Sequence, residues 1–146
     1  MKSYELLLSP FVAWLLSQVM KTAIVCIYHK RIDLSRVGGD GGMPSSHSSI
    51  VAALATACAC RYGFDSSQFA ISLTLALIVM HDASGVRLES GKQAKVINEI
   101  REYLQSLSFK SSHDRLEELL GHTPLQVFVG AVLGIAVAII LHVILA

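Results

Sequence analysis

Two long apolar runs do most to limit what this chain can fold into. Residues 6–28 and 125–146 are each long enough to cross a hydrocarbon core of about 30 Å as an α-helix rising about 1.5 Å per residue. The composition agrees, because 53% of the residues are hydrophobic and 16% are charged, against about 25% charged in soluble domains. We therefore expect an integral membrane protein.

Two shorter apolar runs lie between them. Residues 48–60 are rich in alanine and stop at Arg61, so this run reaches a spanning length only if its helix starts near Ser45. Its small side chains allow close helix contacts and favour an inner position. Residues 69–80 follow Asp65-Ser66-Ser67, a helix-capping pattern. The prediction is an all-α membrane bundle with about four spans, forming one domain over residues 1–146.

Residues 91–109 have a different pattern. Apolar side chains recur there at three- and four-residue spacing with charged residues between them, which is typical of an amphipathic helix and not of a span. We expect this helix to lie along the membrane interface or to cover a partner subunit. A turn over 110–115 and a short helix beginning at 116–120 should follow it.

Glycine, proline, serine and histidine crowd together at residues 39–49. Glycines precede Pro44, Ser45, Ser46 and His47, and an apolar run follows. Such a loop presents backbone N–H groups and hydroxyls to an anion at a helix N-terminus, with Pro44 in the first turn and Ser45 or Ser46 as the cap. An ordinary glycine loop with a serine cap is the alternative, but it does not explain His47.

Charged side chains also occur at three positions within or directly next to the apolar runs. Lys21 lies inside the first apolar run, so it either snorkels to the interface or serves as a ligand. Asp82 and Arg87 follow the third run and form either a surface ion pair or part of a site. His142, near the end of the last run, is expected to be interfacial.

Four spans would place the loops over 28–47 and 87–122 on one side of the membrane. That side carries nine lysines and arginines against two on the other, which predicts that it is cytoplasmic. The same arrangement brings His47, Arg87 and His122 to one face, with Lys21 within reach. The expected location is the inner or plasma membrane of a bacterium, with the site facing the cytoplasm.

Cations, hydroxyls, helix-start amides and two histidines together suit a tetrahedral oxyanion such as phosphate. Phosphoryl transfer depends mainly on positioning and charge stabilisation. The formal net charge is +1, so nucleic acid is not an expected partner. Metal-binding patterns such as HExxH, CxxC or DxD do not occur in the sequence, and we expect no metal ion and no cofactor.

Three strings resemble a known family: Gly41-Gly42-Met43-Pro44-Ser45-Ser46-His47-Ser48, Val79-Met80-His81-Asp82-Ala83-Ser84-Gly85-Val86-Arg87 and Leu119-Leu120-Gly121-His122-Thr123-Pro124. They are similar to the divergent branch of the type 2 phosphatidic acid phosphatase superfamily, membrane proteins related to acid phosphatases and vanadium-dependent haloperoxidases. The resemblance covers residues 18–141.

The resemblance implies a metal-independent phosphatase for lipid phosphates or pyrophosphates. His122 would be the nucleophile that forms a phosphohistidine, and His47 would protonate the leaving group. Phosphate would be held by Lys21, Ser45, Ser46 and Arg87. The sequence departs from the superfamily pattern at Tyr28, where an arginine is expected, at Ser46, which replaces glycine, and in the long gap between Arg87 and His122.

A further departure concerns the partner of His122. The superfamily places a carboxylate four residues after the nucleophilic histidine, where this chain has Gln126. A glutamine carbonyl can hold the imidazole tautomer but cannot neutralise its developing charge, and Asp82 or Glu118 are alternative sources of a carboxylate. Two other readings therefore stay open: a degenerate protein that binds or transports phosphate or a phospholipid headgroup, and a purely structural membrane protein.

Four spans are few for a bundle of this superfamily, which normally has six helices. In a homodimer, helices of the second subunit would help to enclose the site. Gly130 and Gly134 form a small-xxx-small pair in the last run that is typical of tight helix contacts. We expect dimerisation through this face or through the amphipathic helix.

Overall fold

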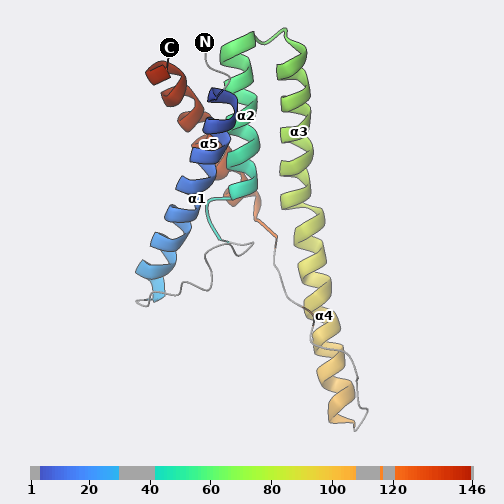
Figure 1. Cartoon of the computed structure of the whole chain (residues 1–146). Helices are drawn as coiled ribbons and strands as arrows, with labels where there is room; N and C mark the ends of the chain where they lie inside the picture. Colours follow the sequence, from blue (N-terminus) through green and yellow to red (C-terminus); the bar gives the residue numbers. More distant parts are fainter. Residues whose placement is uncertain (1–3, 30–41, 108–115, 117–120, 146) are drawn as a thin grey trace.

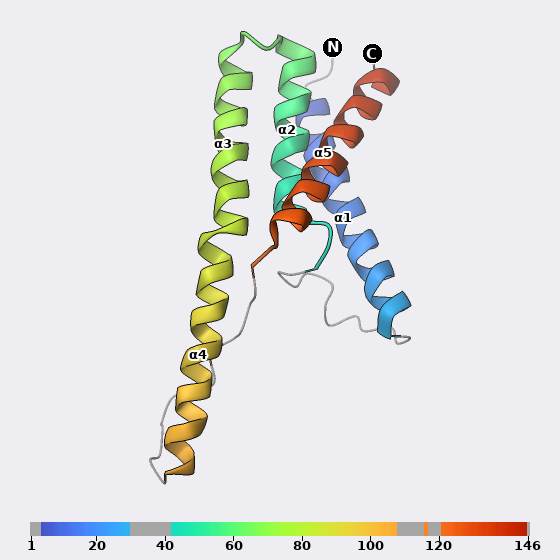
Figure 2. The same ribbon diagram turned by 180° about the vertical axis from the view of Figure 1, so that it is seen from behind.

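The computed structural model describes residues 4–29, 42–107, 116 and 121–145. The described part of the chain is helical, and its helices are α1 (Glu5–His29), α2 (Ser46–Tyr62), α3 (Ser67–Ser84), α4 (Val86–Ser106) and α5 (Pro124–Leu145). Figures 1 and 2 show α1, α2, α3 and α5 side by side, with both termini at one end of the bundle. The predicted all-α membrane bundle is confirmed.

Helix α2 is the central element of the bundle. It packs against α1, α3 and α5, and its alanines make these contacts close. Ala53 and Ala57 are fully buried against Ala13 of α1 and Ala138 of α5. A second buried group joins α2 to Ala76 of α3. The prediction of an inner, alanine-rich helix is confirmed, because small side chains let three neighbours approach one helix.

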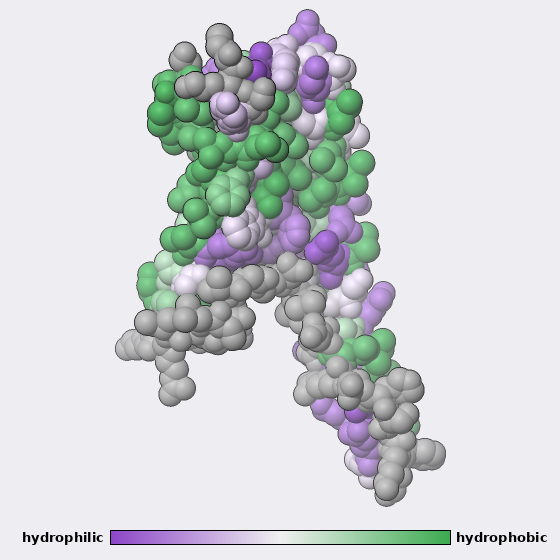
Figure 3. Space-filling model, viewed as in Figure 1, coloured by the Kyte–Doolittle hydropathy of each residue, from purple (hydrophilic) through white to green (hydrophobic). Residues whose placement is uncertain are grey.

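Among the residues that the structure describes, three segments are long and apolar enough to cross a membrane: Glu5–Ile27, Ser67–Ser106 and Pro124–Leu145. Helix α2 has 17 residues, which corresponds to about 25 Å of rise. Ser66 caps α3 by accepting a hydrogen bond from the backbone N–H of Phe69, as the sequence predicts. The space-filling view shows hydrophobic side chains around the middle of the bundle and polar ones towards both of its ends (Figure 3).

Helix α4 begins directly after α3, with Gly85 between them. It starts at Val86 and not at residue 91 as the pattern predicts, so residues 86–90 belong to the same helix. Figure 1 shows α4 extending beyond the bundle as a continuation of α3. The turn expected over 110–115 and most of the short helix expected at 116–120 lie outside the described residues.

The two glycines of α5 serve a contact within the chain. A Cβ atom added at Gly130 would collide with the carbonyl oxygen of Ser45, and one added at Gly134 with that of Ser49. Both glycines are buried against α2. The expectation that this face mediates dimerisation is therefore wrong, because α2 already covers it.

Candidate active site

The N-terminus of α2 is built by Ser45. Its hydroxyl accepts hydrogen bonds from the backbone N–H of Ser48 at 3.4 Å and from the Ser48 hydroxyl at 3.1 Å. Ser45, not Ser46, is the cap. Pro44 precedes the cap, so its predicted place in the first helical turn is wrong.

Lys21 points into the bundle. It is 7% exposed, and its Nζ donates to the hydroxyl of Ser46 at 3.2 Å. This contact joins the lower half of α1 to the first residue of α2. Lys21 therefore does not snorkel, and it brings a positive charge to the start of α2.

His122 lies just before α5 and is 2% exposed. Its backbone N–H donates to the carbonyl of Ala83 at 3.0 Å, which fixes the segment against the end of α3. Its Nδ1 is 3.3 Å from Oε1 of Gln126. Gln126, one turn further along the chain, is thus a partner of the imidazole.

The backbone N–H of Thr123 settles how Gln126 is oriented. It donates to the same Oε1 at 3.0 Å, and a backbone N–H can only donate, so the atom facing it is the amide oxygen. That oxygen must accept from His122 as well. In the neutral form of His122, Nδ1 then carries the proton and Nε2 has the lone pair.

The second histidine, His47, stands in the first turn of α2. The centres of the His47 and His122 rings are 6.2 Å apart, with the ring planes inclined at 58°. The backbone N–H of Ser45 also donates to the carbonyl of Gln126 at 3.1 Å, which ties the start of α2 to the start of α5. Lys21, Ser45, Ser46, His47, His122 and Gln126 thus form one connected polar cluster.

Arg87 and Asp82 are paired with each other. Nε of Arg87 lies 2.9 Å from a carboxylate oxygen of Asp82, and both side chains are more than 40% exposed. Asp82, predicted as an orienting group, contacts Arg87, while Gln126 contacts His122. The role of Arg87 in phosphate binding stays a prediction.

The long gap between Arg87 and His122 is closed by backbone packing. Gly121 lies directly on the backbone of Arg87 and Leu88, where an added Cβ would collide with the backbone nitrogen of Leu88. The sequence therefore places His122 beside the end of α3 although α4 intervenes. The contacts of the Thr123 N–H and the Ala83 carbonyl could not be predicted from the sequence, because both groups belong to the backbone and carry no residue-type signal.

His142 is remote from this cluster. Its Nδ1 lies 2.7 Å from a carboxylate oxygen of Glu5, so it joins the start of α1 to the end of α5. Both helices reach the bundle end that carries the termini (Figure 2). This supports the expectation that His142 is not part of the site. Glu118 and Tyr28 have no described side-chain geometry.

The fold and the cluster define an integral-membrane helical bundle with paired histidines, a buried lysine and a serine-rich helix start. Residues 3–137 match the Divergent PAP2 family, and the chain belongs to that family. It is similar to the uncharacterized membrane protein YuiD of Bacillus subtilis (strain 168), with 43% identity over 145 residues and 92% of each chain covered. No solved structure matches the chain.

Proposed function

We propose that this protein is a metal-independent phosphatase that hydrolyses lipid phosphates or pyrophosphates through a phosphohistidine on His122. The observation that carries the proposal is the double hydrogen bond to Oε1 of Gln126, from Thr123 N–H and His122 Nδ1. In the neutral form of His122 these contacts place the proton on Nδ1, so the lone pair that attacks phosphorus is on Nε2.

The first half-reaction would transfer the phosphoryl group to His122. Nε2 attacks phosphorus, the bond from phosphorus to the lipid oxygen breaks, and the protonated His47 gives its proton to that oxygen. The 6.2 Å separation of the ring centres supports two imidazoles acting on one phosphoryl group. The alcohol or shortened phosphate leaves.

The second half-reaction would release inorganic phosphate. Water attacks the phosphohistidine while the now neutral His47 takes a proton from it, and the bond between phosphorus and Nε2 breaks. Both groups return to their starting states. The ammonium of Lys21 and the amides at the start of α2 offset phosphate charge in both steps, so the chemistry requires no metal.

The direct test is phosphate release from a panel of lipid phosphates and diphosphates by purified protein without added metal. His122→Ala should abolish release, whereas His142→Ala, the matched change at the far end of the bundle, should retain it. Equal rates for wild type and His122→Ala would contradict the proposal.

A second function is favoured by Gln126 itself. An amide cannot neutralise an imidazolium, so a protein that binds or transports phosphate or a phospholipid headgroup would keep the same contacts without turnover. This second function would be supported if the folded protein binds vanadate or phosphate tightly but releases no phosphate from any substrate.

We further propose that the site faces the cytoplasm of a bacterium, on the strength of the excess of lysine and arginine on its side. Ser67 begins α3 at the opposite end of the bundle and is exposed. In a Cys60→Ser background, Ser67→Cys should react with a membrane-impermeant maleimide added to intact cells. If the introduced cysteine reacts only after the cells are opened, the protein has the opposite orientation in the membrane.

A further inference from the structure

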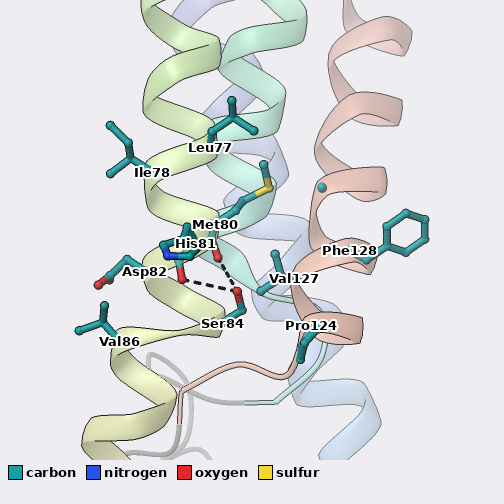
Figure 4. A pocket seen from close by; sticks show the side chains of 11 residues that line it. Leu77, Ile78, Met80, His81, Asp82, Ser84, Val86, Pro124, Val127 and Phe128 are labelled. Carbon is teal, nitrogen blue, oxygen red and sulfur yellow. Dashed lines mark hydrogen bonds between the residues drawn. The ribbon is translucent and has the colours of Figure 1, made fainter.

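An open groove of about 930 Å³ lies between the lower parts of α3 and α5 (Figure 4). It exists because α2 packs against both helices while α3 and α5 have few contacts with each other. Its volume lies in the range of small-molecule sites, about 300–1,000 Å³. The described contacts leave this groove open on the outer surface of the bundle.

The groove changes from apolar to polar along its length. Leu77 and Ile78 of α3 and Val127 and Phe128 of α5 form the apolar wall, and His81, Asp82 and Ser84 lie towards its lower end. Ile78 is 62% and Phe128 65% exposed, and both belong to segments apolar enough to span a membrane. A wholly polar ligand would find few partners along this wall.

The lower end of the groove adjoins the candidate active site. Pro124 lines the groove and stands two residues after His122. Ala83, between the groove residues Asp82 and Ser84, accepts the backbone hydrogen bond of His122. The groove and the polar cluster therefore share one wall, made of the end of α3 and the start of α5.

We propose that the groove between α3 and α5 holds the hydrocarbon chain of the substrate, which reaches the site sideways from the bilayer. The inference rests on the proposed phosphatase function and narrows its substrate to phosphate esters that carry a long chain. An amphiphilic ligand suits both parts of the groove. Its hydrocarbon chain would lie along the apolar wall, and its phosphate head would lie at the polar end, beside the segment that holds His122.

The proposal can be tested with a substitution that fills the groove and with two substrates that share the same phosphate headgroup but differ in chain length. Ala131 lines the groove, and Ala131→Phe should block it. Ala136→Phe is the matched control, because Ala136 is an exposed residue of the same helix outside the groove lining. Equal melting temperatures of the two variants would show that both fold.

Ala131→Phe should lower kcat/KM for a long-chain phosphatidic acid by about tenfold or more, because losing the burial of two methylene groups already has that effect. The kcat/KM for a water-soluble short-chain phosphatidic acid should stay as in wild type, and Ala136→Phe should change neither. Equal losses for both substrates, or no loss, would overturn the groove assignment.

A labelling experiment separates the groove from the catalytic proposal. A long-chain phosphatidic acid with a photoreactive group in its chain should label residues around Ile78 and Phe128, and Ala131→Phe should reduce that labelling. This result would hold even if the wild type released no phosphate, which would reject the catalytic function alone. Labelling spread over the outer faces of all helices would reject the groove.

Discussion

Gln126 is the side chain on which the chemistry of the site depends most. Its Oε1 accepts from the Thr123 backbone at 3.0 Å and faces Nδ1 of His122 at 3.3 Å. These contacts orient the imidazole, but in the proposed mechanism they would leave its positive charge unbalanced once Nε2 is phosphorylated. In the proposed mechanism, an amide in this position should therefore give a slower reaction than a carboxylate would.

Gln126→Glu should raise kcat for phosphate release. The carboxylate keeps both hydrogen bonds and stabilises the imidazolium, and in a serine protease triad the opposite exchange costs about 10⁴ in rate. We expect a gain of about tenfold or more, with that figure as the upper bound. Gln126→Met, which lacks the acceptor, should lower kcat, and an unchanged rate in Gln126→Glu would count against catalysis by His122.

Lys21 supplies charge to the site, and its removal should weaken anion binding. Lys21→Met keeps most of the volume and removes the ammonium 3.2 Å from the Ser46 hydroxyl. We expect Kd for vanadate to rise about tenfold or more, in line with the cost of losing a charged hydrogen bond, with the fold retained. Lys92→Met, at an exposed position of α4, is the control, and equal affinities for the two variants would show that Lys21 does not bind the anion.

The contact between α2 and α5 holds the site together. Gly130 brings the backbone of α5 onto Ser45, which caps α2, and the N–H of Ser45 reaches the Gln126 carbonyl at 3.1 Å. A pair of glycines that sequence alone associates with dimerisation thus positions the serine loop. We therefore expect that substitutions in α5 that alter its packing against α2 will also change the geometry of the candidate active site.

Gly130→Ala should disturb both stability and activity. The added methyl group meets the Ser45 carbonyl, which belongs to the backbone and cannot rotate away, so overpacking of about 1–3 kcal/mol is expected. Thermal unfolding in detergent and phosphate release should both show the loss. Ala136→Val adds bulk on the exposed face of α5, and a Gly130→Ala protein as stable as this control would refute the close approach.

The helices were predictable from local patterns, because long apolar runs and serine caps act within a few residues of where they stand. The inward direction of Lys21, the choice of Ser45 as cap and the covering of Gly130 by α2 were not, since each depends on which helix lies alongside. The same holds for the site: His47, His122 and Gln126 were predictable as residue types, while the Thr123 and Ala83 backbone contacts appear only once α3 and α5 meet.

At the scale of the whole molecule, helix α4 carries a row of exposed apolar side chains. Helix α4 extends past the bundle (Figure 1), and Ile97, Ile100, Leu104 and Leu107 are each more than 40% exposed. Their spacing of three and four residues forms one stripe along the helix. Of the two surfaces expected to mediate a homodimer, the Gly130 face is covered by α2, and we propose that the dimer forms through this stripe.

Replacing Ile100 and Leu104 by glutamate should convert a dimer to a monomer. Charges in the middle of the stripe would have to be buried without partners, which is costly. Light scattering in mild detergent should give twice the chain mass for wild type and a single mass for the double variant. A monomer mass for wild type at every concentration would reject the dimer.

The most direct test of the account is to trap the covalent intermediate. Wild-type protein mixed with a lipid phosphate, quenched rapidly and digested under alkaline conditions, should carry a phosphoryl group on His122 by mass spectrometry. The modification should be absent from His122→Ala. Phosphate release without any phosphohistidine, or with the phosphoryl group on another residue, would contradict the mechanism proposed for this site.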